Sequence, residues 1–203
     1  MFQQFRNFSV LCALTLTMLM SGTAQATLLD RDLDHNGQVD AFYDTDLNIT
    51  WLRNANVNGR MPWGTAISWA DGLSFAGYDD WRLPISDGCL QTNCTRSEMG
   101  HLFYIELGNS AGALTNTGKF RNLLFSTYWS GTAENGVPSA AVAFGMNGFQ
   151  VYILARDTTA LYAMAVRPGD VAPIPEISSQ GALLLGLMVL GLRMHPKSRN
   201  LEC

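Results

Sequence analysis

The chain has 203 residues, a length that suits one domain or one domain with tails. Charged residues make up 15% and apolar residues 47% of the sequence, a composition that excludes wholesale disorder. The net charge of −4 is a poor match to a phosphate backbone, so no nucleic-acid partner is expected.

Residues 1–26 are predicted to be a secretory signal peptide. Arg6 supplies the positive start, residues 10–20 form an apolar run, and Ala24-Gln25-Ala26 has the small-x-small pattern of a cleavage site. An N-terminal membrane anchor is the alternative, but the run is shorter than the ~20 residues that span a bilayer. The exported core is therefore expected to be residues 27–170.

An acidic segment opens this core. From Asp32 it follows the first nine positions of an EF-hand-type calcium loop, with Gly37 at the sharp turn. The twelfth position holds Tyr43 instead of glutamate, and no flanking helix pair is evident. A calcium site and a solvated turn rich in Asp and Asn both remain open. The candidate calcium ligands are Asp32, Asp34, Asn36, Gln38, Asp40 and Asp44.

The next elements are short strands and two helices. Residues 42–52, rich in aromatic and β-branched side chains, predict one or two strands with a turn around Asp46. A helix is expected from Pro62 to about Ala76, ended by Gly77. Its apolar face would be Ala66, Ile67, Ala70 and Leu73, with Trp63 and Trp69 beside it.

A capping box from Thr95 to Glu98 predicts the second helix, which would end at Gly108. Its inward side chains would be Met99, Leu102, Phe103 and Leu107. Between the two helices, Cys89 and Cys94 lie in a polar loop, where a local disulfide or a free thiol pair for metal or redox chemistry is possible. Zinc would need two more ligands, and no Cys or His pair at zinc spacing exists, so the disulfide is favoured.

The second half predicts strands at 127–130, 140–145, 149–154 and 161–166. Asn147-Gly148 between the middle two is a strong hairpin signal. Helices followed by antiparallel strands indicate an α+β fold, in which short helices pack on antiparallel strands.

Six short motifs follow one another between residues 28 and 170. They are Tyr43-Asp44, Trp51-Leu52, Trp81-Arg82-Leu83-Pro84, a helix with Glu98 and Leu102, Tyr128-Trp129-Ser130-Gly131 and Ala165-Val166-Arg167-Pro168. In this order they resemble the Lcl C-terminal domain family, a domain of unknown function named after a collagen-like bacterial adhesin. The Arg-Leu-Pro, Trp-Ser and Val-Arg segments also resemble C-type-lectin-like and sulfatase-modifying-factor folds, a likeness that carries no chemistry by itself.

The residues of these motifs suit structural roles. Trp51, Trp81 and Trp129 are expected in the core, the alternative being a carbohydrate-binding face of exposed aromatic side chains. Arg82 and Arg167 are expected to pair with Asp79, Asp80 or backbone carbonyls.

The tail, residues 171–203, has three parts. A box from Pro173 to Ser178 precedes an apolar run, predicted as a short transmembrane segment at about 181–194, and a basic end with Arg193, Lys197 and Arg199. This arrangement resembles the PEP-CTERM sorting signal, and the resemblance implies membrane placement and an exosortase-type processing enzyme.

No catalytic motif is evident, and no nucleophile has a visible base and orienting partner, so the protein is not expected to be an enzyme. The sequence favours a surface or extracellular-matrix protein, in the periplasm or beyond, with a non-catalytic domain for polysaccharide or glycan. The alternatives are an envelope polymer-acting enzyme, which would need Asp79, Asp80, Glu98 and His101 in one cleft, and a structural matrix component without a ligand.

Overall fold

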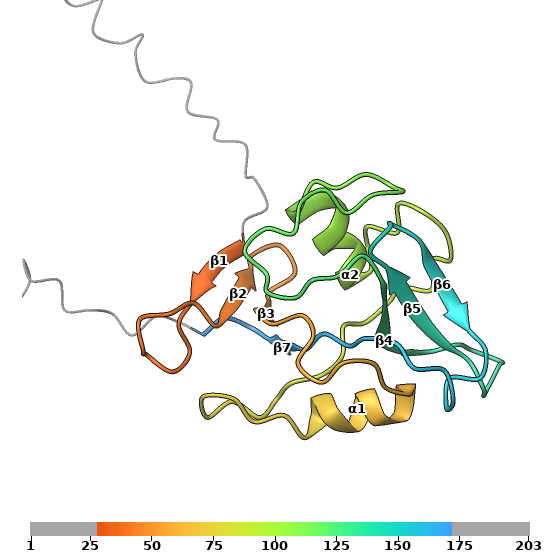
Figure 1. Ribbon diagram of the computed structural model, residues 1–203, viewed down its shortest axis with the longest axis horizontal. Coiled ribbons are helices and arrows are strands. Elements are labelled where there is room, and N and C mark those ends of the chain that lie inside the picture. The colour runs from red at the N-terminus through yellow and green to blue at the C-terminus, as the bar shows by residue number, and fades with distance from the viewer. Residues whose placement is uncertain (1–27, 172–203) are drawn as a thin grey trace, which may run out of the picture.

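The computed structural model describes residues 28–171, which form two antiparallel sheets, two short helices and one π-helical turn (Figure 1). The first sheet has the order β1-β2-β3-β7 and the second the order β4-β5-β6. The expected α+β fold is confirmed. The strands are β1 (Leu28–Arg31), β2 (Ala41–Asp44), β3 (Ile49–Leu52), β4 (Thr127–Ala133), β5 (Ala141–Gly145), β6 (Gln150–Ile153) and β7 (Val166–Pro168).

The second sheet is covered on both faces. Tyr128 pairs with Phe144, and the next pair along the strands is Trp129 with Ala143. Because successive side chains in a strand point to opposite faces, these two pairs enter different hydrophobic clusters. The first cluster includes the helical segment around Leu102, and the second includes the buried alanines of the other helix.

The first sheet joins the two ends of the described chain. Its strand β7 pairs with β3, more than a hundred residues away in sequence. Phe42 lies opposite Trp51 and packs toward the cluster of Leu102. Trp51, Trp81 and Trp129 are all buried, which confirms that these tryptophans belong to the core and not to a displayed face.

The first helix, α1 (Trp63–Asp71), is shorter than predicted. Pro62 precedes it and Gly72, a poor helix former, ends it five residues before Gly77. The expectation of a helix to Ala76 was wrong because Phe75 and Tyr78 form a tight backbone pair around Ala76, whose φ is 52°.

The second helical segment consists of α2 (Glu98–His101) and the π-helical turn η1 (Leu102–Glu106). The predicted capping box was wrong: Ser97, not Thr95, caps the helix by accepting from the Gly100 amide. Glu98 is instead held by an arginine. The four predicted inward side chains, Met99, Leu102, Phe103 and Leu107, are buried as expected.

Three of the four predicted later strands are confirmed as β4, β5 and β6, with the Asn147-Gly148 turn between β5 and β6. The fourth was wrong, because β7 begins only at Val166. Before it, Leu161 and Tyr162 form single bridges to Met61 and Tyr128. This segment crosses from one sheet to the other, which prevents a continuous ladder. Strand β1 was not predicted.

No helix among residues 28–171 is long and apolar enough to cross a membrane. The predicted signal peptide (1–26) and the predicted membrane segment (about 181–194) lie outside the described residues.

Gly100 offers a test of this packing. A Cβ at Gly100 would overlap the backbone carbonyl of Cys94, whereas one at Gly64 in α1 would meet nothing within 4 Å. We therefore expect Gly100→Ala to destabilise the protein by about 2 kcal/mol or more. Gly64→Ala should be neutral or stabilising by up to about 1 kcal/mol. Urea unfolding measures both changes, and equal stabilities of the two variants would contradict this packing.

Candidate functional site

The loop between the two helical segments is closed by a disulfide. Cys89 and Cys94 are bonded, with Cα atoms 5.6 Å apart, so the favoured prediction for this pair is confirmed. The backbone amide of Gln150 donates to the carbonyl of Gln91 at 3.0 Å, and the Gln150 side chain donates to the carbonyl of Cys89. The disulfide loop therefore holds the beginning of β6.

The acidic loop brings three of its predicted calcium ligands together. Carboxylate oxygens of Asp32, Asp34 and Asp40 lie within 4.8 Å of one another. Burial, followed by the nearby charges of Asp34 and Asp32, raises the pKa of Asp40 against the opposing effect of its hydrogen bond from Leu33.

Several of these side-chain oxygens already accept hydrogen bonds from backbone amides of the same loop. Asp32 accepts from the amides of Asn36 and Gly37 at 3.1 and 2.7 Å, and Asn36 Oδ1 accepts from the amide of Gln38 at 2.8 Å. Such bonds are typical of a self-supporting turn rich in Asp and Asn. Calcium in this loop therefore stays a prediction, and the sixth candidate, Asp44, belongs to a different cluster.

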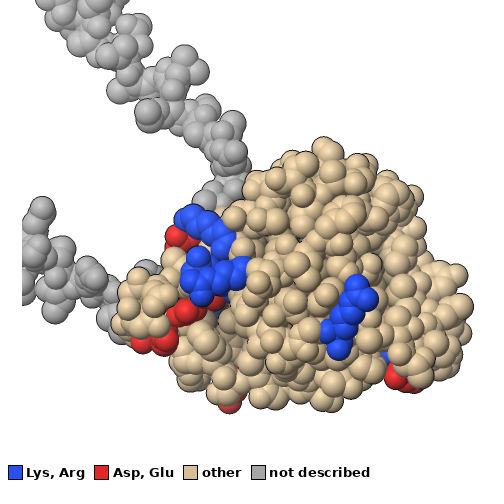
Figure 2. Space-filling model, in the orientation of Figure 1, with Lys and Arg blue, Asp and Glu red and all other residues tan. Residues whose placement is uncertain are grey.

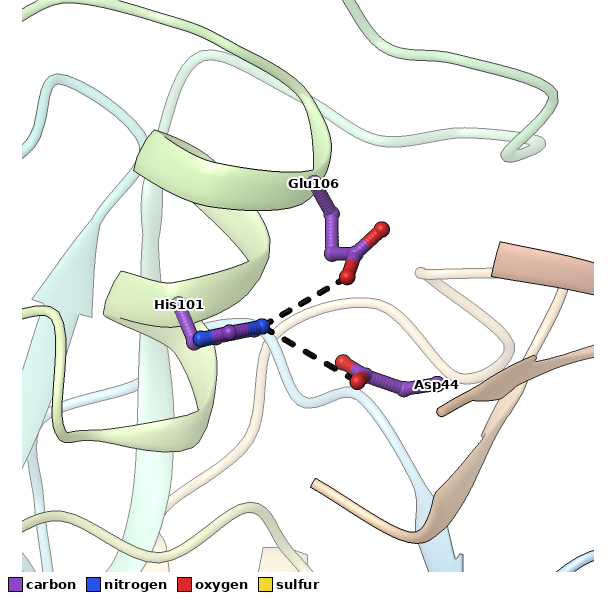
Figure 3. A group of neighbouring side chains, drawn as sticks. All are labelled: Asp44, His101 and Glu106. Atoms are coloured by element: carbon purple, nitrogen blue, oxygen red, sulfur yellow. Dashed lines mark ion pairs between the residues drawn. The ribbon is translucent and has the colours of Figure 1, made fainter. Parts of the chain in front are cut away.

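That cluster is buried between the first sheet and the second helical segment (Figure 3). The imidazole Nε2 of His101 lies 3.4 Å from Glu106 Oε1 and 3.9 Å from Asp44 Oδ1. The exposed fractions of the side chains are 12% for His101, 1% for Glu106 and 0% for Asp44. Asp46, which is half-exposed, approaches the same nitrogen to 3.8 Å.

The π-helical turn explains why His101 and Glu106 share a face. Five residues along an α-helix, at about 100° each, would separate the two side chains by roughly 140°. The wider turn of η1 instead places both toward Asp44 at the end of β2 (Figure 3). Single π-helical turns are frequent at functional sites.

Asp44 is held firmly in place. Its Oδ1 accepts from the amides of Asp46 and Leu47 at 3.2 and 3.0 Å, and its Oδ2 accepts from Trp51 Nε1 at 3.4 Å. The two amides belong to the turn between β2 and β3, and Trp51 belongs to β3 itself. The carboxylate is therefore positioned by the fold independently of His101.

Two atoms of the cluster find no hydrogen-bond partner among residues 28–171. His101 Nε2 and Glu106 Oε1 are buried, and their 3.4 Å contact does not have hydrogen-bond geometry. An unsatisfied buried polar group costs about 1–3 kcal/mol. Burial, the Asp44 charge and, more weakly, the Asp46 charge raise the pKa of Glu106 against the opposing effect of His101.

The residues proposed for an envelope enzyme are engaged separately. Glu98 forms two hydrogen bonds with Arg82, at 2.7 and 2.8 Å, while Asp80 forms two with Arg167, at 2.7 and 2.9 Å. The Arg167 pair was expected and lowers the pKa of Asp80. His101 faces other carboxylates, and Asp79 is exposed. The structure therefore does not gather these four residues into one group of catalytic side chains.

Sequence reasoning did not find the cluster of Asp44, His101 and Glu106. His101 was considered among the residues of an envelope enzyme, and Asp44 was assigned to the acidic loop. The only local signal is the five-residue spacing of His101 and Glu106, which points to one site only if the helix is known to contain a π turn.

Comparison with known proteins identifies the class of domain. The Lcl C-terminal domain family matches residues 40–167, which include both sheets apart from β1 and the last residue of β7. The chain belongs to this family. No curated protein and no solved structure matches the chain, and the predicted likeness to lectin-like folds stays a prediction.

Glu106→Gln tests the energetics of the cluster. A raised pKa means that the folded state holds the Glu106 proton more tightly than the unfolded state. The ionised Glu106 side chain therefore lowers the stability of the fold at pH values above the ordinary pKa of glutamate. With chelator present at pH 7, we expect Glu106→Gln to raise the melting temperature by about 2–4 °C, or about 1 kcal/mol. The gain should shrink toward pH 4.

The control is Glu134→Gln, which removes a carboxylate outside the cluster. It should change the melting temperature little at either pH. A lower melting temperature for Glu106→Gln at both pH values would show that the charged carboxylate stabilises the fold.

Proposed function

We propose that this protein is exported and acts outside the cytoplasm as a non-catalytic interaction domain of the cell surface or extracellular matrix. The observation that carries this proposal is the disulfide between Cys89 and Cys94, because such bonds persist in oxidising compartments. In this proposal residues 1–26 are the signal peptide. Residues 171–203 are a PEP-CTERM-like sorting tail that passes the membrane and meets an exosortase-type enzyme.

The proposed ligand is a polysaccharide, and its binding surface is the edge of the second sheet. Phe149, Val151 and Tyr152 are exposed along β6 and its preceding turn, with exposed fractions of 45%, 39% and 48%. We call these three residues the β6 edge. Val151 and Tyr152 point to opposite faces of the sheet, so the edge displays apolar surface on both sides. Tyrosine suits such a surface because it combines an apolar ring with a polar hydroxyl.

The disulfide loop makes this edge suitable for a ligand. Thr92 pairs with Phe149, and the Gln91 carbonyl binds the Gln150 amide, so backbone groups at the start of the edge are already satisfied. Covering part of an edge strand in this way limits its pairing with other strands. The aromatic side chains remain exposed while the strand itself is braced.

The distribution of charge favours an uncharged ligand. Figure 2 shows that most charged side chains on the viewed face gather at the end that holds β1 and β2, with a separate basic group nearer the middle and a few acidic atoms at the lower edge and toward the opposite end. Some of these charges pair with each other, as Lys119 does with Asp30 and Arg31 with Asp170. The β6 edge itself carries no charged side chain, and the nearby Arg156 and Asp157 pair with each other, so this surface offers little attraction to a charged polymer. The acidic loop lies at the opposite end of the domain from the β6 edge (Figure 1), so a calcium ion there would stabilise the fold and not contact the polysaccharide.

Export predicts a defined N-terminus and an oxidised cysteine pair. When the full chain is produced with its own leader in a Gram-negative host, mass spectrometry should find a mature chain that begins at Thr27. Cys89 and Cys94 should resist alkylation until a reductant is added. Replacing Ala24 and Ala26 by bulky residues should block the cleavage. An uncleaved cytosolic chain with both thiols alkylated would contradict the proposal.

Binding is tested with a panel of neutral and acidic exopolysaccharides. We expect Phe149→Ala and Tyr152→Ala each to weaken binding about tenfold, since each removes an exposed aromatic contact. Leu29→Ala, an exposed apolar residue of β1 in the other sheet, is the matched control and should bind normally. Isothermal titration calorimetry provides the affinities. Loss of biofilm strength in a deletion strain, without any measurable binding, would favour a structural matrix component instead.

A further inference from the structure

We propose that Asp44, His101 and Glu106 bind one zinc-like divalent transition-metal ion, with Asp46 beside the site on its exposed side. This inference goes beyond the proposed function and does not depend on export or on polysaccharide binding. It rests on the donor atoms, their spacing, their burial and the way the fold holds them.

The spacing of the donor atoms suits a four-coordinate ion. Zinc bound to nitrogen and oxygen at about 2.0–2.1 Å in a tetrahedron places neighbouring ligand atoms about 3.4 Å apart. His101 Nε2 lies 3.4 Å from Glu106 Oε1 and 3.9 Å from Asp44 Oδ1. One donor from each of the three residues lies within 4.8 Å of the others. The distance between His101 and Glu106 already equals the tetrahedral value, and that between His101 and Asp44 exceeds it by about 0.5 Å.

Two of the three atoms that would bind the ion, on His101 and Glu106, are otherwise unused. The Glu106 side chain is 99% buried, and its Oε1 points at His101 Nε2 (Figure 3). Neither atom has a hydrogen-bond partner in the described part of the chain. Among residues 28–171, no lysine or arginine forms an ion pair with Asp44, Asp46 or Glu106. A divalent cation would supply the positive charge and the bonds that these buried groups lack.

The donor types select the kind of ion. Imidazole nitrogen is a ligand of zinc, copper, iron and nickel, whereas calcium and magnesium prefer sets made of oxygen alone. One imidazole with two or three carboxylates therefore favours a zinc-like ion. The acidic loop, with its set of carboxylates, is a different and separate candidate.

The fold holds the ligands before an ion arrives. Two backbone amides of the turn after β2 and the Trp51 indole in β3 fix Asp44. The π turn sets His101 and Glu106 on one side of the helix. Asp46 is 47% exposed and approaches His101 Nε2 to 3.8 Å, so it offers a fourth oxygen and a route from solvent. Such prior positioning reduces the entropy that binding must overcome.

The test uses the full-length chain, stripped with chelator and dialysed, and Co²⁺ as a spectroscopic probe for zinc. We expect one equivalent of Co²⁺ to produce the visible absorption of a four-coordinate ion, and Zn²⁺ to displace it. His101→Asn and Glu106→Gln should each weaken binding by about 100-fold or more. His35→Asn is the matched control, because His35 lies in the acidic loop and has a φ of 59° that asparagine tolerates. It should bind normally, as should Asp34→Asn.

A measurement on the unaltered protein covers the case in which a variant does not fold. During the Co²⁺ titration, the NMR signals of the His101 ring should shift strongly while those of His35 do not. The inference is overturned if folded wild-type protein binds neither Co²⁺ nor Zn²⁺, or binds only Ca²⁺. It is also overturned if binding survives in His101→Asn and is lost in Asp34→Asn, or if the His35 ring is the one that shifts.

Discussion

Arg82 and Glu98 form an ion pair with two hydrogen bonds of 2.7 and 2.8 Å. This pair connects the first sheet to α2, which are not neighbours along the chain. The backbone of Arg82 exchanges two hydrogen bonds with Val166 in β7, so its guanidinium reaches out from the first sheet. Glu98 begins α2 and also accepts from the amide of Ile85 at 2.7 Å. Two residues after Arg82, the Pro84 carbonyl accepts from Gly131 in β4. The first sheet, α2 and the second sheet are therefore connected to one another around the carboxylate of Glu98.

This junction determines where the second helical segment lies and therefore what its side chains face. Its apolar side packs against Phe42, Trp51 and Phe144 in the main hydrophobic cluster. Its other side brings His101, the last residue of α2, and Glu106, the last residue of η1, to the end of β2. If this helix lay elsewhere, Asp44 would keep its hydrogen bonds from the following turn and Trp51 but would no longer face His101. The buried polar cluster thus follows from the same contacts that close the core.

Much of the fold is predictable because its signals are local. Aromatic and β-branched side chains in residues 42–52 indicate strands there, Asn147-Gly148 indicates the hairpin, and two cysteines five residues apart in a polar loop indicate the disulfide. The tryptophans could be assigned to the core from their size and their positions beside short strands. These predictions need only neighbouring residues, and they are confirmed by the structure.

The errors come from contacts that are distant in sequence. Glu98 was expected to cap its own helix, but Arg82 pairs with it instead, and Ser97 caps the helix. The strand before Val166 is broken because Tyr162 bridges to Tyr128 in the second sheet, whereas Ala165 accepts from Leu52 in the first. Asp44 was counted with the acidic loop because it follows that loop in sequence, although the end of β2 turns it toward His101. A π turn has no simple sequence pattern, so the alignment of His101 with Glu106 could not be foreseen.

The most direct test of the central role of Arg82 and Glu98 is a double-mutant cycle measured by urea unfolding. The variants are Arg82→Met, Glu98→Gln and the two combined. We predict that each single change costs about 3 kcal/mol or more and that the double variant costs clearly less than their sum, with a coupling above about 1 kcal/mol. Additive losses, with a coupling near zero, would show that the two residues contribute independently and that the sheets and the helix are held together by other contacts.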